Sequence, residues 1–195
     1  MNIQSFQQDG YQVLKEFLAP ERCRKLRAAA AAALQPLLAP VEYEADTGYP
    51  GAPESRVATG GQTSRRLLAA YARDPLFRAL ATDPELRAVL HELLGEAPLL
   101  SQAHHNCVMT KHPGYSSQTL WHQDIRYWSF AAPALISAWF ALTEERQGNG
   151  GLLLIPGSHR LEIAPYRLDE KLFLRPELPE NAELIKAARA GELEP

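Results

Sequence analysis

The stretch QTLWHQDIRYW, residues 118–128, decides how this chain can be interpreted. Its aromatic and β-branched residues favour a β-strand. In a strand, residues two apart project from the same face, so His122 and Asp124 would lie side by side while Gln123 points away. An imidazole nitrogen beside a carboxylate oxygen suits a divalent first-row metal ion. The stretch therefore predicts two ligands of a metal site.

Two ligands do not complete a site, and the pair has more than one explanation. With a second histidine it would form the facial triad of non-haem Fe(II) oxygenases, which leaves three coordination positions open for a chelating co-substrate and O2. The chain holds six histidines, however, so a histidine two residues from an aspartate also arises by chance. The pair alone is a weak signal and favours a coincidence over a metal site.

The sequence changes character after Gly95. Four segments beyond it are rich in aromatic and β-branched residues and are separated by Gly, Pro and Asn, which is typical of strands. They are residues 98–114, 118–130, 133–145 and 150–159. Residues 98–195 are therefore predicted to be largely β-structure.

Residues 1–97 are predicted to be mostly helical. Residues 3–35 are expected to be helical with a break at Gly10, and an alanine-rich body of high helix propensity follows Pro20. Helical signals return over residues 64–72. Two Asp-Pro pairs then predict an N-cap followed by a first-turn proline, and they open the segments 74–81 and 83–95.

Residues 39–63 interrupt this helical half. They carry three prolines and four glycines without any period, which predicts a long loop. With Tyr43 and Tyr49, the loop is a candidate lid over a substrate mouth. Helices followed by strands predict an α+β fold, and 195 residues fit a single domain, residues 1–195.

Composition excludes several classes of function. A formal charge of −3 and a pI of about 6.1 do not favour nucleic acid or an anionic membrane as a partner. No apolar run reaches the length of a transmembrane helix, and the first residues lack the pattern of a signal peptide. Cys23 and Cys107 are far apart and have no CxxC partner. We therefore expect reduced thiols in a cytoplasmic protein.

Four motifs occur in a recognisable order and spacing. They are FQQDGYQVLKEFLAPERC (6–23), WHQDIRYW (121–128), ISAWFAL (136–142) and GNGGLLLIPGSHR (148–160). Together they resemble the phytanoyl-CoA dioxygenase (PhyH) family of Fe(II)/2-oxoglutarate-dependent oxygenases, over most of residues 5–165. The resemblance implies a mainly β core, a double-stranded β-helix or jelly roll, with the N-terminal helices packed on its outside.

The resemblance also implies an activity and its cofactors. The enzyme would hydroxylate a small organic substrate, using Fe(II), 2-oxoglutarate as co-substrate and O2, with succinate and CO2 as the other products. His122 and Asp124 would bind the iron and serve catalysis. Related halogenases carry a small residue at the position of Asp124, so the carboxylate favours hydroxylation.

Further residues are assigned by their position in the family pattern. The resemblance places His105, Cys107 and Trp139 at the co-substrate, and Arg66 at the co-substrate or the substrate. Three of them have a plainer alternative: His105 as a hydrogen-bonded core histidine, Trp139 as a packing residue, Arg66 as a solvated charge on a helix. His159 belongs to the PGSH turn, where the family's histidine does not bind iron.

Two expected residues of the family pattern have no counterpart in this sequence. The distal histidine follows a Gly-Asp turn on a later strand, and an arginine about ten residues beyond it would pair with 2-oxoglutarate. No histidine follows His159. We expect a truncated portion of a longer enzyme, because a half-built barrel leaves costly open edges. A chain that ended at Pro195 is expected to bind metal weakly and not to turn over.

Other classes of function stay open. The main alternative is a non-catalytic jelly-roll module that binds a small ligand or a protein. A zinc hydrolase that uses His122 and Asp124 is a lesser one, since no motif places a general base. A small-molecule substrate is expected in place of nucleic acid or membrane, and the sequence leaves its identity and the oligomeric state open.

Overall fold

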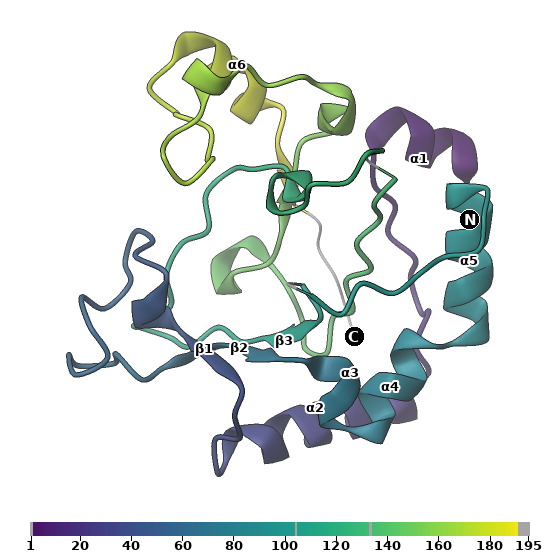
Figure 1. The fold of residues 1–195 in the computed structure, drawn as a ribbon, viewed down its shortest axis with the longest axis vertical. Coiled ribbons are helices and arrows are strands. Elements are labelled where there is room, and N and C mark those ends of the chain that lie inside the picture. The colour runs from purple at the N-terminus through teal and green to yellow at the C-terminus, as the bar shows by residue number, and fades with distance from the viewer. Residues whose placement is uncertain (1, 104, 133, 191–195) are drawn as a thin grey trace. The chain divides into compact units, whose positions relative to one another are not determined.

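A computed structural model describes residues 2–103, 105–132 and 134–190 (Figure 1). The chain divides into two compact units. Unit 1 comprises residues 1–17, 120–135 and 143–195, and unit 2 comprises residues 18–119 and 136–142. Helices and antiparallel strands occur together, as the predicted α+β class requires.

Unit 2 is built around an antiparallel sheet with the strand order β1-β2-β3 (Figure 1). The strands are β1 (Val41–Tyr43), β2 (Ser64–Leu68) and β3 (Cys107–Met109). Arg66 is opposite Glu42 on one side and Met109 on the other, and Leu68 is opposite Cys107. Because paired residues of antiparallel strands share a face, these five side chains project from the same face of the sheet.

Two predictions for this unit are wrong. Residues 64–68, predicted to be helical, form the central strand β2, in which Arg65 and Leu67 are the buried positions. Residues 39–63, predicted to be a long loop, contain β1 and the 3₁₀ turn η1 (Glu44–Asp46). Strands on both sides provide β2 with hydrogen-bonding partners, and such tertiary pairing overrides local helix propensity.

The helices of unit 2 form its apolar core. They are α2 (Pro20–Leu34), α3 (Ala70–Arg73), α4 (Pro75–Ala81) and α5 (Pro84–Leu94). Leu26 and Ala30 of α2 pack with Phe77 and Leu80 of α4, and Val108 of β3 lies against this cluster. The core therefore joins two helices to the sheet.

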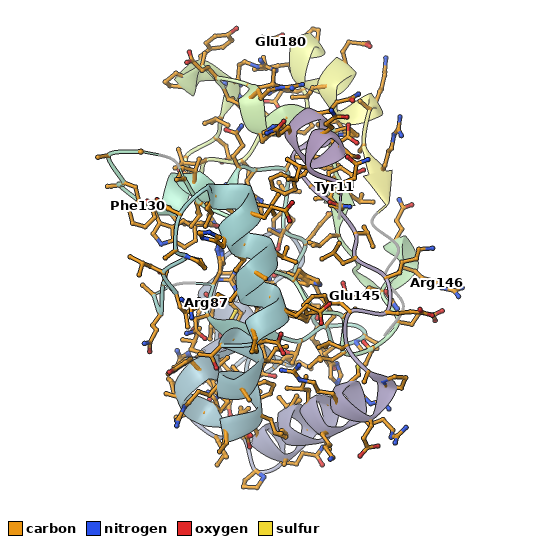
Figure 2. The ribbon with its side chains drawn as sticks, turned by 90° about the vertical axis from the view of Figure 1, so that its right-hand side faces the viewer. Tyr11, Arg87, Phe130, Glu145, Arg146 and Glu180 are labelled. Atoms are coloured by element: carbon orange, nitrogen blue, oxygen red, sulfur yellow. The ribbon has the colours of Figure 1, made fainter. Side chains whose placement is uncertain are left out.

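The predicted helix ends of α4 and α5 are confirmed. The carboxylate of Asp74 accepts the Leu76 N–H at 2.7 Å, and that of Asp83 accepts the Glu85 and Leu86 N–H groups at 2.9 and 3.2 Å. Gly95 ends α5 with a left-handed φ of 75°. Leu86 on α5 is buried, whereas Arg87, labelled in Figure 2, is exposed.

Unit 1 consists of short elements and turns. They are α1 (Ile3–Asp9), η2 (Asp124–Tyr127), η3 (Gln147–Asn149), β4 (Leu153–Leu154), η4 (Ser158–Arg160), η5 (Pro165–Arg167), α6 (Pro179–Lys186) and β5 (Arg189–Ala190). β4 pairs antiparallel with β5. Glu180, labelled in Figure 2, lies in the first turn of α6. Where the structure describes the chain, no helix is long and apolar enough to cross a bilayer.

The predicted strands over residues 118–130 and 133–145 are wrong: none of their described residues lies in a strand, although Glu145 forms a β-bridge. Residues 124–127 form the 3₁₀ turn η2, and residues 136–142 are assigned to no helix or strand. Only short pieces of the other two predicted segments pair, as β3 and β4. A β-prone sequence becomes a strand only where another strand offers hydrogen bonds, and composition does not reveal that partner.

Candidate functional site

His122 and Asp124 lie together in unit 1. The Nε2 atom of His122 is 3.2 Å from Oδ1 of Asp124, although neither residue is in a strand. Gln123 between them has an extended backbone, with φ −104° and ψ 130°. One extended residue is enough to direct its two neighbours to the same side. The side-by-side arrangement thus occurs without the predicted ladder.

The orientation of the imidazole follows from a second contact. Nδ1 of His122 is 2.7 Å from the carbonyl oxygen of Leu120. The ring is therefore held with Nδ1 at a backbone oxygen and Nε2 facing the Asp124 carboxylate. Metal-binding histidines are commonly oriented in this way, with the second ring nitrogen held by a backbone oxygen.

The separation of the two atoms fits cis ligands of one ion. With bonds of about 2.1 Å, neighbouring ligand atoms of an octahedral ion are roughly 3 Å apart. The carboxylate of Asp124 also remains 40% exposed, which leaves it accessible to an ion from solvent. Within the described residues, no group of three His, Cys, Asp or Glu side chains gathers at one point. The chain therefore shows two fitting ligands.

The side chain of Gln123 forms hydrogen bonds with residues other than Leu120, the partner of His122. Its Nε2 donates to the carbonyl oxygens of Ser158 and Leu161, at 2.9 and 3.0 Å. The Ser158 oxygen belongs to the PGSH motif and Leu161 lies just after it, so two motifs that are distant in sequence meet within unit 1. Sequence reasoning gave Gln123 no role beyond pointing away from the pair.

Phe173 and Arg126 also surround the pair and were missed by sequence reasoning. The Phe173 ring lies edge-on to the His122 ring with centroids 5.7 Å apart, and the Arg126 guanidinium lies 4.3 Å from the centroid of Phe173. No signal in the segment LDEKLFL (168–174) distinguishes Phe173 from an ordinary core residue.

The expected co-substrate residues lie in unit 2. Arg66 and Cys107 share one face of the sheet, and Nε of Arg66 is 3.4 Å from Oε2 of Glu42. Arg66 is thus a strand residue, and its interpretation as a solvated helix charge is wrong. Burial raises the pKa of the Cys107 thiol, and the nearby Arg66 opposes that rise. The thiol is therefore protonated at neutral pH and is free of any disulfide.

His105 and Trp139 lie outside regular strands. His105 is partly buried two residues before β3, and its carbonyl oxygen accepts the Cys107 N–H at 3.0 Å. Trp139 is 41% exposed. Phe140 and Leu142, beside it, pack on the core of unit 2, and the thiol of Cys23 lies 3.8 Å from the Leu142 carbonyl oxygen. The segment 136–142 is held on α2 by these contacts.

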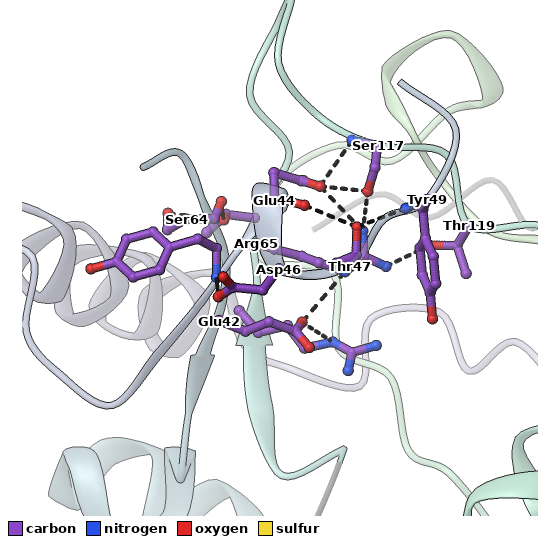
Figure 3. A network of polar contacts seen from close by, with 12 residues as sticks. Glu42, Glu44, Asp46, Thr47, Tyr49, Ser64, Arg65, Ser117 and Thr119 are labelled. Carbon is purple, nitrogen blue, oxygen red and sulfur yellow. Dashed lines mark hydrogen bonds and ion pairs between the residues drawn. The ribbon is translucent and has the colours of Figure 1, made fainter. Parts of the chain in front are cut away.

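A buried polar network fixes the strand β2 at Arg65 (Figure 3). The Arg65 side chain is 1% exposed and that of Glu44 is fully buried. Oε2 of Glu44 accepts the Ser117 N–H at 2.9 Å, and the two guanidinium ends of Arg65 donate to Ser117 Oγ and Thr119 Oγ1 at 2.7 and 2.6 Å. The network ties β2 to η1 and to the residues just before the His122 stretch.

Lys111 borders this network. Its Nζ donates to the Ser117 carbonyl oxygen at 2.8 Å. Burial lowers the pKa of Lys111, and the positive charge of Arg65 lowers it further. The side chain also lines an open hollow of about 810 Å³, together with residues 56–58 and 60–64.

The two tyrosines of the candidate lid are engaged by arginines. The Arg56 guanidinium lies 4.7 Å from the centroid of the Tyr43 ring, and that of Arg65 lies 5.0 Å from the centroid of Tyr49. Such cation–π contacts are worth about 0.5–2 kcal/mol each. The Arg65 contact holds Tyr49 against β2, whereas the Arg56 contact lies within the segment itself, and the role of the segment as a lid stays a prediction.

Comparison with known proteins identifies relatives. The family model described as Phytanoyl-CoA dioxygenase (PhyH) matches residues 6–194. The ectoine dioxygenase of Bordetella parapertussis is 26% identical over 168 residues, 83% of this chain and 50% of that protein. That of Sphingopyxis alaskensis is 29% identical over 163 residues, 80% of this chain and 48% of that protein.

A third relative comes from an animal. The phytanoyl-CoA dioxygenase domain-containing protein 1 of Danio rerio is 23% identical over 190 residues, 81% of this chain and 64% of that protein. The chain spans about half the length of the two ectoine dioxygenases. The resemblance seen in the sequence motifs is confirmed, and since the family model matches nearly the whole chain, the protein belongs to the phytanoyl-CoA dioxygenase family.

Proposed function

We propose that this chain carries part of an Fe(II)- and 2-oxoglutarate-dependent oxygenase that hydroxylates a small organic substrate. The observation that carries the proposal is the 3.2 Å approach of His122 Nε2 to Asp124 Oδ1, with Nδ1 held by Leu120. Membership of the family supplies the context. We further propose a jelly-roll core for the whole protein.

His122 and Asp124 would hold the metal, through Nε2 and one carboxylate oxygen. When bound, Fe(II) supplies the O2 chemistry that couples decarboxylation of 2-oxoglutarate to C–H hydroxylation: substrate, O2 and 2-oxoglutarate give the alcohol, succinate and CO2. The chain's own part is to present the two ligands on one side of Gln123 and to keep the imidazole in one orientation. Roles for His105, Cys107, Trp139 and Arg66 at the co-substrate remain part of this proposal.

The relatives give a starting point for identifying the substrate. Ectoine dioxygenases are among the relatives, so ectoine is the first compound to assay. Acyl-CoA is not proposed as the substrate, because no run of basic residues in the sequence indicates a site for the CoA phosphates. We propose a small polar molecule as the substrate.

Anaerobic titration with Fe(II) and 2-oxoglutarate tests the proposal directly. The chain is expected to develop a weak visible charge-transfer band, which zinc cannot produce. His122→Ala and Asp124→Asn should lose the band, whereas His159→Ala, a change at an exposed histidine outside the pair, should keep it.

Two outcomes would reject the oxygenase. One is a band of equal intensity in the wild type and in His122→Ala. The other is the absence of any band at saturating iron, which would favour the non-catalytic binding module.

A further inference from the structure

The segment Leu168–Leu174 of unit 1 closes on itself around Asp169. Oδ1 of Asp169 accepts the Lys171 and Phe173 N–H groups at 2.9 and 2.8 Å, and the Asp169 N–H donates to the Phe173 carbonyl oxygen at 2.8 Å. Leu168 and Leu174 form an isolated antiparallel bridge at its base. We call these residues the Asp169 loop. Its hydrogen bonds fix the backbone of Phe173.

The Asp169 loop is attached to the stretch that holds the metal ligands. The Leu174 N–H donates to the Trp121 carbonyl oxygen at 2.8 Å. On the other side of the pair, the Arg126 guanidinium donates to the Leu172 carbonyl oxygen and lies over the Phe173 ring. The loop is thus anchored both before His122 and after Asp124.

Between these anchors, Phe173 meets the His122 ring. The ring centroids are 5.7 Å apart with planes at 66°, and Phe173 is 1% exposed. Edge-to-face packing is directional, unlike simple burial. The imidazole is therefore held by the Leu120 carbonyl oxygen at Nδ1 and by two rings beside it, Phe173 at 5.7 Å and the more distant Tyr127 at 6.3 Å.

We propose that Phe173 is a positioning residue for His122, and that the Asp169 loop serves to hold it there. What this inference predicts for metal binding rests on the proposed function. What it predicts for the orientation of the His122 imidazole does not. Without the Phe173 ring, His122 gains freedom to rotate away from the Leu120 carbonyl oxygen, and Nε2 is no longer held towards Asp124.

The first arm of the test measures the orientation of the His122 ring in the metal-free chain. Nuclear Overhauser effects and three-bond couplings should show one His122 rotamer in the wild type, with its signals assigned by His122→Ala. Phe173→Leu should average His122 over several rotamers, and Phe173→Tyr, which keeps the ring, should retain the wild-type rotamer. Ile155→Ala is the matched control, because it removes a buried apolar side chain of the same unit, 7% exposed, outside the loop.

The second arm measures Co²⁺ affinity without any turnover. Phe173→Leu is expected to weaken binding about 10- to 100-fold, as changes around a ligand typically do. Phe173→Tyr should bind within about threefold of the wild type. Should Phe173→Leu not fold, Asp169→Ala provides the second variant, because it removes the acceptor that fixes the Phe173 backbone.

The two arms separate the inference from the proposed function. A single His122 rotamer in Phe173→Leu and in Asp169→Ala would overturn the inference, whatever the metal does. Loss of that rotamer in Ile155→Ala as well would equally overturn it, since the effect would then be one of general stability. A wild-type chain that binds no Co²⁺ would reject the proposed function while the rotamer measurement still decides the role of Phe173.

Discussion

Single residues show how differently two neighbouring arginines can be used. Arg65 is 1% exposed and pairs with the buried Glu44 as well as with Glu42, whereas Arg66 has a side chain 17% exposed and pairs with Glu42. A buried ion pair adds little by itself, but removal of one partner leaves the other charge unpaired in the interior. The two positions should therefore respond very differently to the same substitution.

Arg65→Met is expected to destabilise the chain by about 3–5 kcal/mol, because the Glu44 carboxylate would stay buried without its cation. Denaturant unfolding of unit 2 measures this. Arg66→Met is the matched control and should cost about 1 kcal/mol or less, since its partner is partly exposed. Glu44→Gln in the Arg65→Met background should recover part of the loss. Equal losses at both arginines would contradict this account of the network.

At the scale of elements, Asp83 is expected to stabilise α5 in two ways. It accepts two N–H groups at the start of the helix and forms an ion pair with Arg22 of α2. Asp83→Ala should cost about 1–2 kcal/mol, as the loss of an N-cap does. Asp83→Asn keeps the cap and loses the charge, so it should cost less. Thermal unfolding monitored by circular dichroism gives both values, and an Asn variant as unstable as Ala would show that the charge dominates.

The same aspartate predicts a dependence on pH. The Arg22 guanidinium lowers the pKa of Asp83 from its ordinary value of 3.8. A carboxyl whose pKa is lower in the folded state stabilises that state fully above the unfolded value and loses this contribution as pH falls through the folded one. The stability difference between wild type and Asp83→Asn should thus be constant above about pH 5 and shrink below about pH 4. If the stability difference between wild type and Asp83→Asn grew as the pH fell, its sign would be opposite to this prediction, and the lowered pKa of Asp83 would be refuted.

Gly10 predicts a coupling between two sequence motifs. It ends α1 with φ 82°, and a Cβ there would come within 2.1 Å of Nδ1 of His159 in the PGSH motif. Gly10→Ala should cost about 1–2 kcal/mol for the backbone alone, plus the clash with the ring. In a double-mutant cycle, the loss should be smaller when His159 is already alanine, by about 0.5 kcal/mol or more. Strictly additive losses in the free energy of unfolding would mean that the His159 ring moves aside without cost.

Elements also show where sequence reasoning succeeds. The ends of α4 and α5 could be predicted because Asp74, Asp83 and Gly95 act on backbone atoms within a few residues. Strand β2 could not, because its partners lie far away in sequence and its own residues favour a helix. The pair His122 and Asp124 was found because it needs only one extended residue between its members.

The whole molecule sets the limit of the prediction. Phe173 is distant in sequence from His122, and no period or motif connects them, so only the folded chain brings the two rings together. Likewise, the β-rich composition of the second half predicts strands but not which segments find partners. The family match covers residues 6–194, yet the chain spans about half the length of its ectoine dioxygenase relatives. We therefore expect metal binding to be the most informative property to measure on this chain.

Metal binding should stabilise the unit that holds the pair. Trp121 and Trp128 lie in unit 1 and Trp139 in unit 2, so Trp139→Phe leaves fluorescence that reports on unit 1 alone. Mn²⁺ at 100 times its dissociation constant should add about 2.7 kcal/mol and raise the unfolding midpoint by roughly 5–10 °C. The same addition to His122→Ala in this background should leave the midpoint unchanged, because one carboxylate alone holds the ion weakly. An equal rise in both proteins would place the metal elsewhere.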